Sequence, residues 1–179
     1  MNKVIFFIVF LFSTNVFSGE LYESGVHKWP YKKNQLALIS GLSVENDRYY
    51  YFNYSFYILK KQNGKEIWYS VPIMKDKDST KWDFRFNTWS GFSEVMLKNA
   101  KVVVKGSDIF IISADKSDND SFQNVHGPAS LLIYKLQEGN EMSRWRYYFA
   151  LIENKIIPAD QAGHVDEIIT RFEKKLLAE

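Results

Sequence analysis

Two short motifs in this sequence match signatures of a serine acyl-enzyme. Ser113 and Lys116 match Ser-x-x-Lys, and the next three residues, 117–119, read Ser-Asp-Asn. In serine penicillin-recognising enzymes these motifs come from distant parts of the chain and converge in space. Here they adjoin in one polar stretch, and no Lys-Thr-Gly motif occurs. We therefore predict that Ser113 ends a strand, that Lys116 lies in solvent, and that no catalytic serine is present.

Residues that bind metals or phosphate are sparse and scattered. No pair among His27, His126 and His164 has the i, i+4 spacing of a helical zinc site. Asp115, Asp118 and Asp120 could crowd oxygens round calcium, but the EF-hand pattern is missing. No glycine-rich phosphate loop is found. We expect no metal and no cofactor, although a hydrolase whose carboxylates converge from separate strands remains an alternative to a non-enzymatic protein.

Aromatic residues and two arginines form the best candidate for a ligand or partner surface. The aromatic candidates occur on one face of the predicted strands: Tyr49, Tyr51, Tyr57, Trp68 and Trp89. Such side chains bind flat ligands, sugars or protein partners at small entropic cost. Arg144 and Arg146 fall on the same side of a predicted strand and could hold a carboxylate. The alternatives are that a second sheet or the terminal helix covers the aromatic face, and that the arginines serve only solubility.

The elements that position these residues are mainly strands. Aromatics make up 17% of the chain and favour pleated, half-buried surfaces. Alternating apolar residues predict strands over 35–44, 49–59, 82–89, 95–104, 109–113, 129–136 and 144–152. Lysines and aspartates over 75–81 predict an exposed loop, and 115–126 predicts a polar loop.

One predicted turn determines how the two strands that flank it pair. Asn63-Gly64 favours the positive φ angles of a two-residue type I′ hairpin. Such a hairpin places apolar residues opposite one another: Ile58 with Tyr69, Phe56 with Val71, and Tyr54 with Ile73. Residues 105–108 form a second hairpin candidate.

Only the end of the chain has helical periodicity. Five apolar residues follow helical spacing, which predicts a helix at about 162–178: Val165, Ile168, Ile169, Phe172 and Leu176. We therefore predict an α+β fold, mainly antiparallel β, as a sandwich or curled sheet with one C-terminal amphipathic helix packed on one face.

The N-terminus predicts export. Lys3 is followed by the apolar run Val4 to Phe12, by three polar residues, and by Val16-Phe17-Ser18 before Gly19. This order is typical of a signal peptide, so we expect residues 1–18 to be cleaved and 19–179 to form a single β-rich domain. An uncleaved anchor is the alternative.

The chain has no cysteine, which excludes disulfides and fits a bacterial periplasmic protein. A net charge of +2 spread along the chain predicts no nucleic-acid partner, and no membrane partner after cleavage.

Several segments together resemble the CarG-like family, and their order covers most of the mature chain. They are residues 53–58, 68–72, 113–115, 132–136 and 146–149, followed by the closing helix. The family consists of exported periplasmic proteins associated with intrinsic carbapenem resistance and not known to hydrolyse the drug. This sequence departs from the family in lacking cysteines and in having Tyr31-Lys32-Lys33-Asn34-Gln35 where an acidic, glycine-containing loop is expected. No catalytic residue is carried over.

The resemblance implies a non-enzymatic periplasmic protein that contributes to β-lactam resistance, especially to carbapenems, by binding the drug or a cell-wall target. The alternative is a periplasmic immunity protein that neutralises a protein toxin delivered by a competing cell. Small, exported, cysteine-free β proteins suit that task, and an aromatic patch rimmed with charge could be its partner surface.

Overall fold

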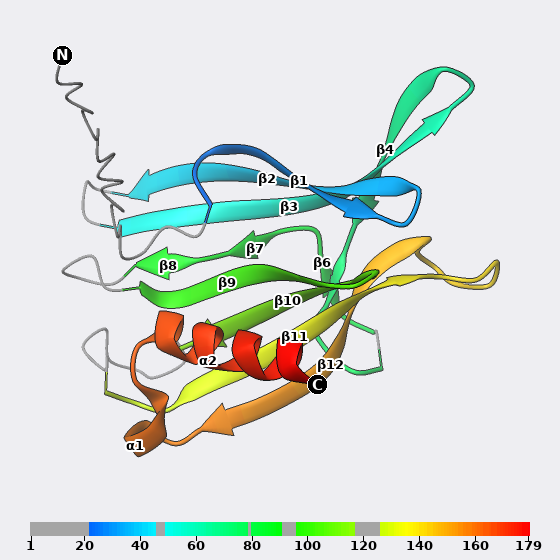
Figure 1. Ribbon diagram of the computed structural model, residues 1–179. Helices are drawn as coiled ribbons and strands as arrows, with labels where there is room; N and C mark the ends of the chain where they lie inside the picture. Colours follow the sequence, from blue (N-terminus) through cyan, green and yellow to red (C-terminus); the bar gives the residue numbers. More distant parts are fainter. Residues whose placement is uncertain (1–21, 46–48, 79, 91–95, 117–125) are drawn as a thin grey trace, which may run out of the picture.

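Two β-sheets lie face to face, and a helix covers the outer side of one of them (Figure 1). The computed structural model describes residues 22–45, 49–78, 80–90, 96–116 and 126–179. In the described part, no helix has both the length and the apolarity needed to cross a membrane. The predicted signal peptide, residues 1–18, lies outside the described residues.

The first sheet has five antiparallel strands. Four of them follow the chain in the order β1-β2-β3-β4, and β7 pairs with β3. The bounds of these strands are β1 (Gly25–Tyr31), β2 (Asn34–Glu45), β3 (Tyr49–Gln62), β4 (Lys65–Val71) and β7 (Phe86–Asn87).

The second sheet has seven strands in the order β6-β5-β12-β11-β10-β9-β8. Its strands are β5 (Ile73–Met74), β6 (Trp82–Asp83), β8 (Trp89–Ser90), β9 (Met96–Lys105), β10 (Asp108–Asp115), β11 (Ala129–Glu138) and β12 (Tyr147–Ile157). Only the β5–β12 pairing is parallel among the described pairs, so the fold is mainly antiparallel β, as predicted.

Strand β10 shows how the layers are arranged. Its odd residues Ile109 and Ile111 face the core between the two sheets, whereas its even residues Phe110 and Ile112 face the helix layer. Alternate side chains of a strand point to opposite faces, so a strand that is apolar at every position must be buried on both. The C-terminal helices are α1 (Ala159–Ala162) and α2 (Val165–Ala178). The apolar stripe of α2 packs on β9 and β10, which confirms the predicted helix.

The predicted register of the β3–β4 hairpin is confirmed up to Val71. Asn63 and Gly64 have φ angles of 51° and 75°, and Phe56 pairs with Val71. The predicted pairing of Tyr54 with Ile73 is wrong. Proline has no N–H to donate to a ladder, and the chain leaves the first sheet at Pro72. Tyr54 pairs instead with Phe86, and Ile73 pairs with Phe149 of the second sheet.

The single strand predicted over 82–89 is three two-residue strands. They belong in turn to the second sheet, the first and the second again. Of its four even members, Phe86 and Thr88 are buried, whereas Phe84 is 41% exposed, and the Thr88 amide donates to the Phe52 carbonyl at 2.9 Å. The prediction was wrong because periodicity describes how side chains alternate along the chain and does not indicate which sheet each pair of residues joins.

Candidate functional site

The aromatic candidates on β3 lie on its uncovered face. Tyr51 and Tyr57 alternate with Phe52 and Phe56, which point into the inter-sheet core. The second sheet therefore covers the opposite face of β3, and α2 packs on the second sheet. Neither covers the outer face of the first sheet. The side chain of Tyr49, the first residue of β3, lies outside the described side chains.

Two ring pairs occur among these candidates. The Tyr51 and Trp89 ring centroids lie 5.4 Å apart, and those of Tyr57 and Trp68 lie 5.7 Å apart. Trp68 keeps 41% of its surface exposed. Large rigid rings that remain in solvent can add contact area to a ligand or partner at little entropic cost.

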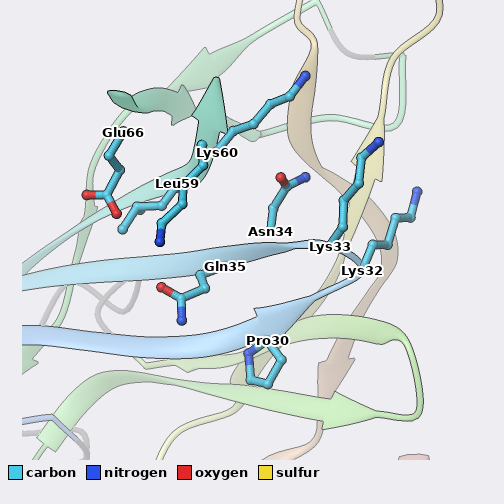
Figure 2. Close-up of a pocket in the computed structure, with 9 residues that line it drawn as sticks. Pro30, Lys32, Lys33, Asn34, Gln35, Leu59, Lys60 and Glu66 are labelled. Atoms are coloured by element: carbon cyan, nitrogen blue, oxygen red, sulfur yellow. The ribbon is translucent and has the colours of Figure 1, made fainter. Parts of the chain in front are cut away.

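Next to the Tyr57–Trp68 pair, the fold gathers lysines that are far apart in the sequence. We call this region the basic corner: Lys32 and Lys33 of the β1–β2 turn, Lys60 and Lys61 of β3, and Arg146 before β12. It contains a concavity of about 730 Å³ with Leu59 in its lining, and an adjoining one of about 390 Å³ beside Glu138. Figure 2 shows that the Lys32, Lys33 and Lys60 side chains extend in a common direction.

The carboxylates around the basic corner already have partners. Lys32 Nζ lies 3.1 Å from Glu138 Oε2, and Arg146 lies 3.9 Å from the other oxygen of Glu138. The hydrogen bond from Lys32 lowers the pKa of the Glu138 carboxyl and raises the pKa of the lysine itself. Trp68 Nε1 donates to Glu66 Oε1 at 2.8 Å.

The turn that carries Lys32 is strained. Lys32 has a φ of 51°, in the left-handed region that costs a residue with a Cβ about 1–2 kcal/mol. Glycine or asparagine is the usual choice at such a position.

The two arginine candidates do not form one site. Both precede β12 instead of lying on it. The Arg144 guanidinium lies 3.9 Å from the Trp82 ring centroid, and Trp145 contacts both Trp82 and Phe84 edge-on. Arg146 faces Glu138 instead. A shared carboxylate clamp is therefore not formed.

A polar cleft of about 370 Å³ opens between the sheets. Lys98 and Asp115 form an ion pair of 2.7 Å in it, and the Asp115 side chain is only 8% exposed. The buried Tyr134 lines the same cleft, and burial, with a smaller contribution from Asp115, raises the pKa of its hydroxyl to about 12. No local motif predicts this cleft, because its lining residues come from six different strands.

The Ser-x-x-Lys residues are buried. Ser113 lies inside β10 and is fully buried, two residues before the strand ends. Lys116 is also buried, so the prediction that it lies in solvent was wrong. Its ammonium donates to the Gly163 carbonyl between the two helices, and burial lowers its pKa. Lys116 directly follows β10, and its side chain reaches the segment between the two helices, which the polar sequence around it did not indicate. Asp118 and Asp120 lie outside the described residues.

No three His, Asp or Glu side chains of the described residues come together as metal ligands would.

The sandwich with a helix on one sheet defines a CarG-like fold. A crystal structure of CarG matches this chain with a TM-score of 0.62, covering 86% of this chain and 94% of CarG at 11% sequence identity. No protein-family model and no curated protein sequence matches. At this identity the match establishes the fold alone.

Proposed function

We propose that this chain is an exported periplasmic protein that protects the cell against β-lactams, carbapenems in particular, by binding and without hydrolysing the drug. The observation that carries the proposal is the CarG fold, which extends over 86% of the chain. The predicted signal peptide at residues 1–18 supports export.

The described surface supports a binding role. The outer face of the first sheet presents Tyr57 and Trp68, and the basic corner adjoins it. The larger concavity of the basic corner is lined mainly by charged and polar side chains, which suits a charged ligand or partner better than an apolar one. In the inter-sheet cleft, the charged side chains of Lys98 and Asp115 form an ion pair with each other.

Expression of the full chain in a carbapenem-sensitive host tests the proposal. The inhibitory concentration should rise while the amount of intact drug in the medium stays equal to that of a vector control. An unchanged inhibitory concentration would contradict protection, and loss of drug from the medium would contradict the non-enzymatic claim.

The second candidate is an immunity protein for a toxin delivered to the periplasm. The cluster of Trp82, Phe84, Arg144 and Trp145 favours it, because tryptophan and arginine are enriched in the residues that dominate protein interfaces. A toxin gene beside this one, with co-purification of its product, would support this candidate. A gene with no such neighbour would leave protection against β-lactams as the better account.

A further inference from the structure

The ion pair of the inter-sheet cleft lies on the inner face of the second sheet. Asp115 occupies the same face of β10 as Ile109 and Ile111, which contribute to the core between the sheets. Lys98 is its ladder partner on β9, and the Lys98 ammonium also lies 5.4 Å from the centroid of the Phe86 ring, which belongs to the first sheet. The pair therefore lies between the two sheets, in the wall of the cleft.

The Tyr134 hydroxyl opens on the same cleft as an unused hydrogen-bond donor. Tyr134 is only 4% exposed, and its hydroxyl has no hydrogen bond to any other described residue. Buried hydroxyls usually have a partner, because an unsatisfied buried donor costs folding energy. With its pKa raised to about 12, this hydroxyl stays protonated near neutral pH and can donate to an acceptor that enters the cleft.

The cleft has spare donors, whereas its carboxylates already have partners. An ammonium group has three N–H donors, and the Lys98 side chain, which is 29% exposed, has one carboxylate partner, Asp115. The other carboxylate in the lining is Asp83, which accepts from the Arg85 amide at 3.1 Å and lies 3.2 Å from Lys75 Nζ. Three cationic residues and two carboxylates line the cleft, so positive charge is in excess. This balance favours a ligand that supplies acceptor oxygens and one negative charge.

The size and the apolar walls of the cleft limit the ligand to a small organic molecule. The volume of about 370 Å³ falls in the range of small-molecule sites. Ile73, Phe86 and Leu132 complete the lining and would contact the carbon skeleton of such a molecule. An inorganic anion would gain only the polar contacts.

We propose that the inter-sheet cleft binds a small molecule with a carboxylate on the carbon next to an acylated nitrogen. The Lys98 ammonium holds the carboxylate, and the Tyr134 hydroxyl donates to the acyl carbonyl. This inference rests on the proposed function for the source of the ligand. A carbapenem has this arrangement within its fused rings, and the acyl-D-Ala-D-Ala end of a cell-wall peptide has it in an open chain. The experiment separates the two sources.

The test is calorimetric titration of protein purified from cells that express the full chain. The probes are meropenem, its carboxylate methyl ester, diacetyl-Lys-D-Ala-D-Ala, and acetate as a carboxylate with no acyl nitrogen. Tyr134→Phe removes only the hydroxyl. Lys98→Gln/Asp115→Asn removes both charges of the ion pair and leaves two side chains of nearly the same size that can still form a hydrogen bond.

Two variants outside the cleft serve as matched controls. Tyr57→Phe removes a hydroxyl from the outer face of the first sheet. Lys101→Gln/Glu173→Gln neutralises an ion pair of 2.6 Å between β9 and α2. Circular dichroism of every variant establishes that it is folded before its affinity is compared.

We expect meropenem or the peptide to bind the wild type, and whichever binds identifies the source. Its affinity should fall about fivefold in Tyr134→Phe and about tenfold or more in Lys98→Gln/Asp115→Asn. The ester and acetate should bind the wild type more weakly than meropenem or the peptide. The affinity of the ester should not fall further in Lys98→Gln/Asp115→Asn, because its carboxyl group is already neutral. Both controls should bind as the wild type does.

Absence of binding by both meropenem and the peptide would overturn the proposal. Unchanged affinity in Tyr134→Phe and in the charge-neutralised variant would do the same, as would equal binding of meropenem and its ester. The inhibitory-concentration assay separates this inference from the proposed function. If Lys98→Gln/Asp115→Asn protects a host as well as the wild type does, the function holds and the assigned site is wrong. If binding depends on the cleft but the host is not protected, the site holds and the proposed function is wrong.

Discussion

Among the described residues, burial strongly perturbs two tyrosine hydroxyls, that of the partly buried Tyr22 and that of the buried Tyr134. The Tyr22 hydroxyl accepts a hydrogen bond from the Val102 amide at 2.8 Å, and Tyr134 lines the inter-sheet cleft. Burial is the main cause that raises the pKa of each hydroxyl from 10.0 to about 12. Burial disfavours the tyrosinate anion in the folded state, whereas the unfolded chain solvates it. Ionisation of these two hydroxyls at high pH therefore disfavours the folded state.

The first prediction is a loss of stability at alkaline pH. The folded pKa of each tyrosine exceeds the unfolded value, so the unfolded chain releases protons first, and stability falls as pH rises from 10 to about 12. Tyr134→Phe should reduce this fall while leaving stability near neutral pH almost unchanged. Urea midpoints measured over this pH range would show it. Identical pH profiles for the variant and the wild type would contradict the assignment.

The second prediction concerns Ser113. A fluorescent penicillin should not label the protein covalently, because Ser113 is fully buried in β10 and the Lys116 ammonium is bound to the Gly163 carbonyl. An in-gel fluorescence assay checks this, with Ser113→Ala as the comparison. Stable labelling that disappears in Ser113→Ala would make the protein a serine acyl-enzyme and would defeat the binding account.

For the individual elements, the sequence predicts turn geometry, but it does not predict which strands pair with one another. Asn63-Gly64 predicted both the turn and its register correctly, because a type I′ turn restricts the φ angles of its two residues. The edge strand β1 was missed because Lys28 and Pro30 interrupt its apolar pattern. The basic corner was missed because its two lysine pairs, near residues 32 and 60, come together only through the sheet.

The β1–β2 turn gives the third prediction. Lys32→Gly should stabilise the protein by up to about 1 kcal/mol, because relief of left-handed strain, about 1–2 kcal/mol, exceeds an exposed ion pair of about 0–1 kcal/mol. Urea denaturation of both proteins measures the difference. Gly64→Ala is the converse control, since Gly64 has a φ of 75° and should lose stability on substitution. A clear loss of stability in Lys32→Gly would show that Lys32 contributes more to folding than its contacts indicate.

The helix layer gives the fourth prediction. Ile168 is fully buried between α2 and the second sheet, so Ile168→Ala should cost about 3 kcal/mol through lost apolar contact and a cavity. Leu177, on the same helix, is 49% exposed, and Leu177→Ala should cost under about 0.5 kcal/mol. Thermal or urea unfolding compares the two. Similar costs at both positions would contradict the packing of α2 on the second sheet.

In the described part of the molecule, the stacking of the layers leaves one face of one sheet uncovered. The helix covers the second sheet, and the two sheets cover each other, so the outer face of the first sheet has no covering element among the described residues (Figure 1). The chain carries a net charge of only +2, yet its fold places several lysines, from the β1–β2 turn and from β3, at one end of the first sheet.

We propose that this chain acts in the periplasm and protects the cell by binding. The most direct measurement is the carbapenem inhibitory concentration of a sensitive host that expresses the full chain, the chain without residues 1–18, or the vector alone, with intact drug in the medium quantified for each. We expect that only the full chain raises the inhibitory concentration and that the drug stays intact. Equal protection by the leaderless chain, no protection by either, or consumption of the drug would contradict it.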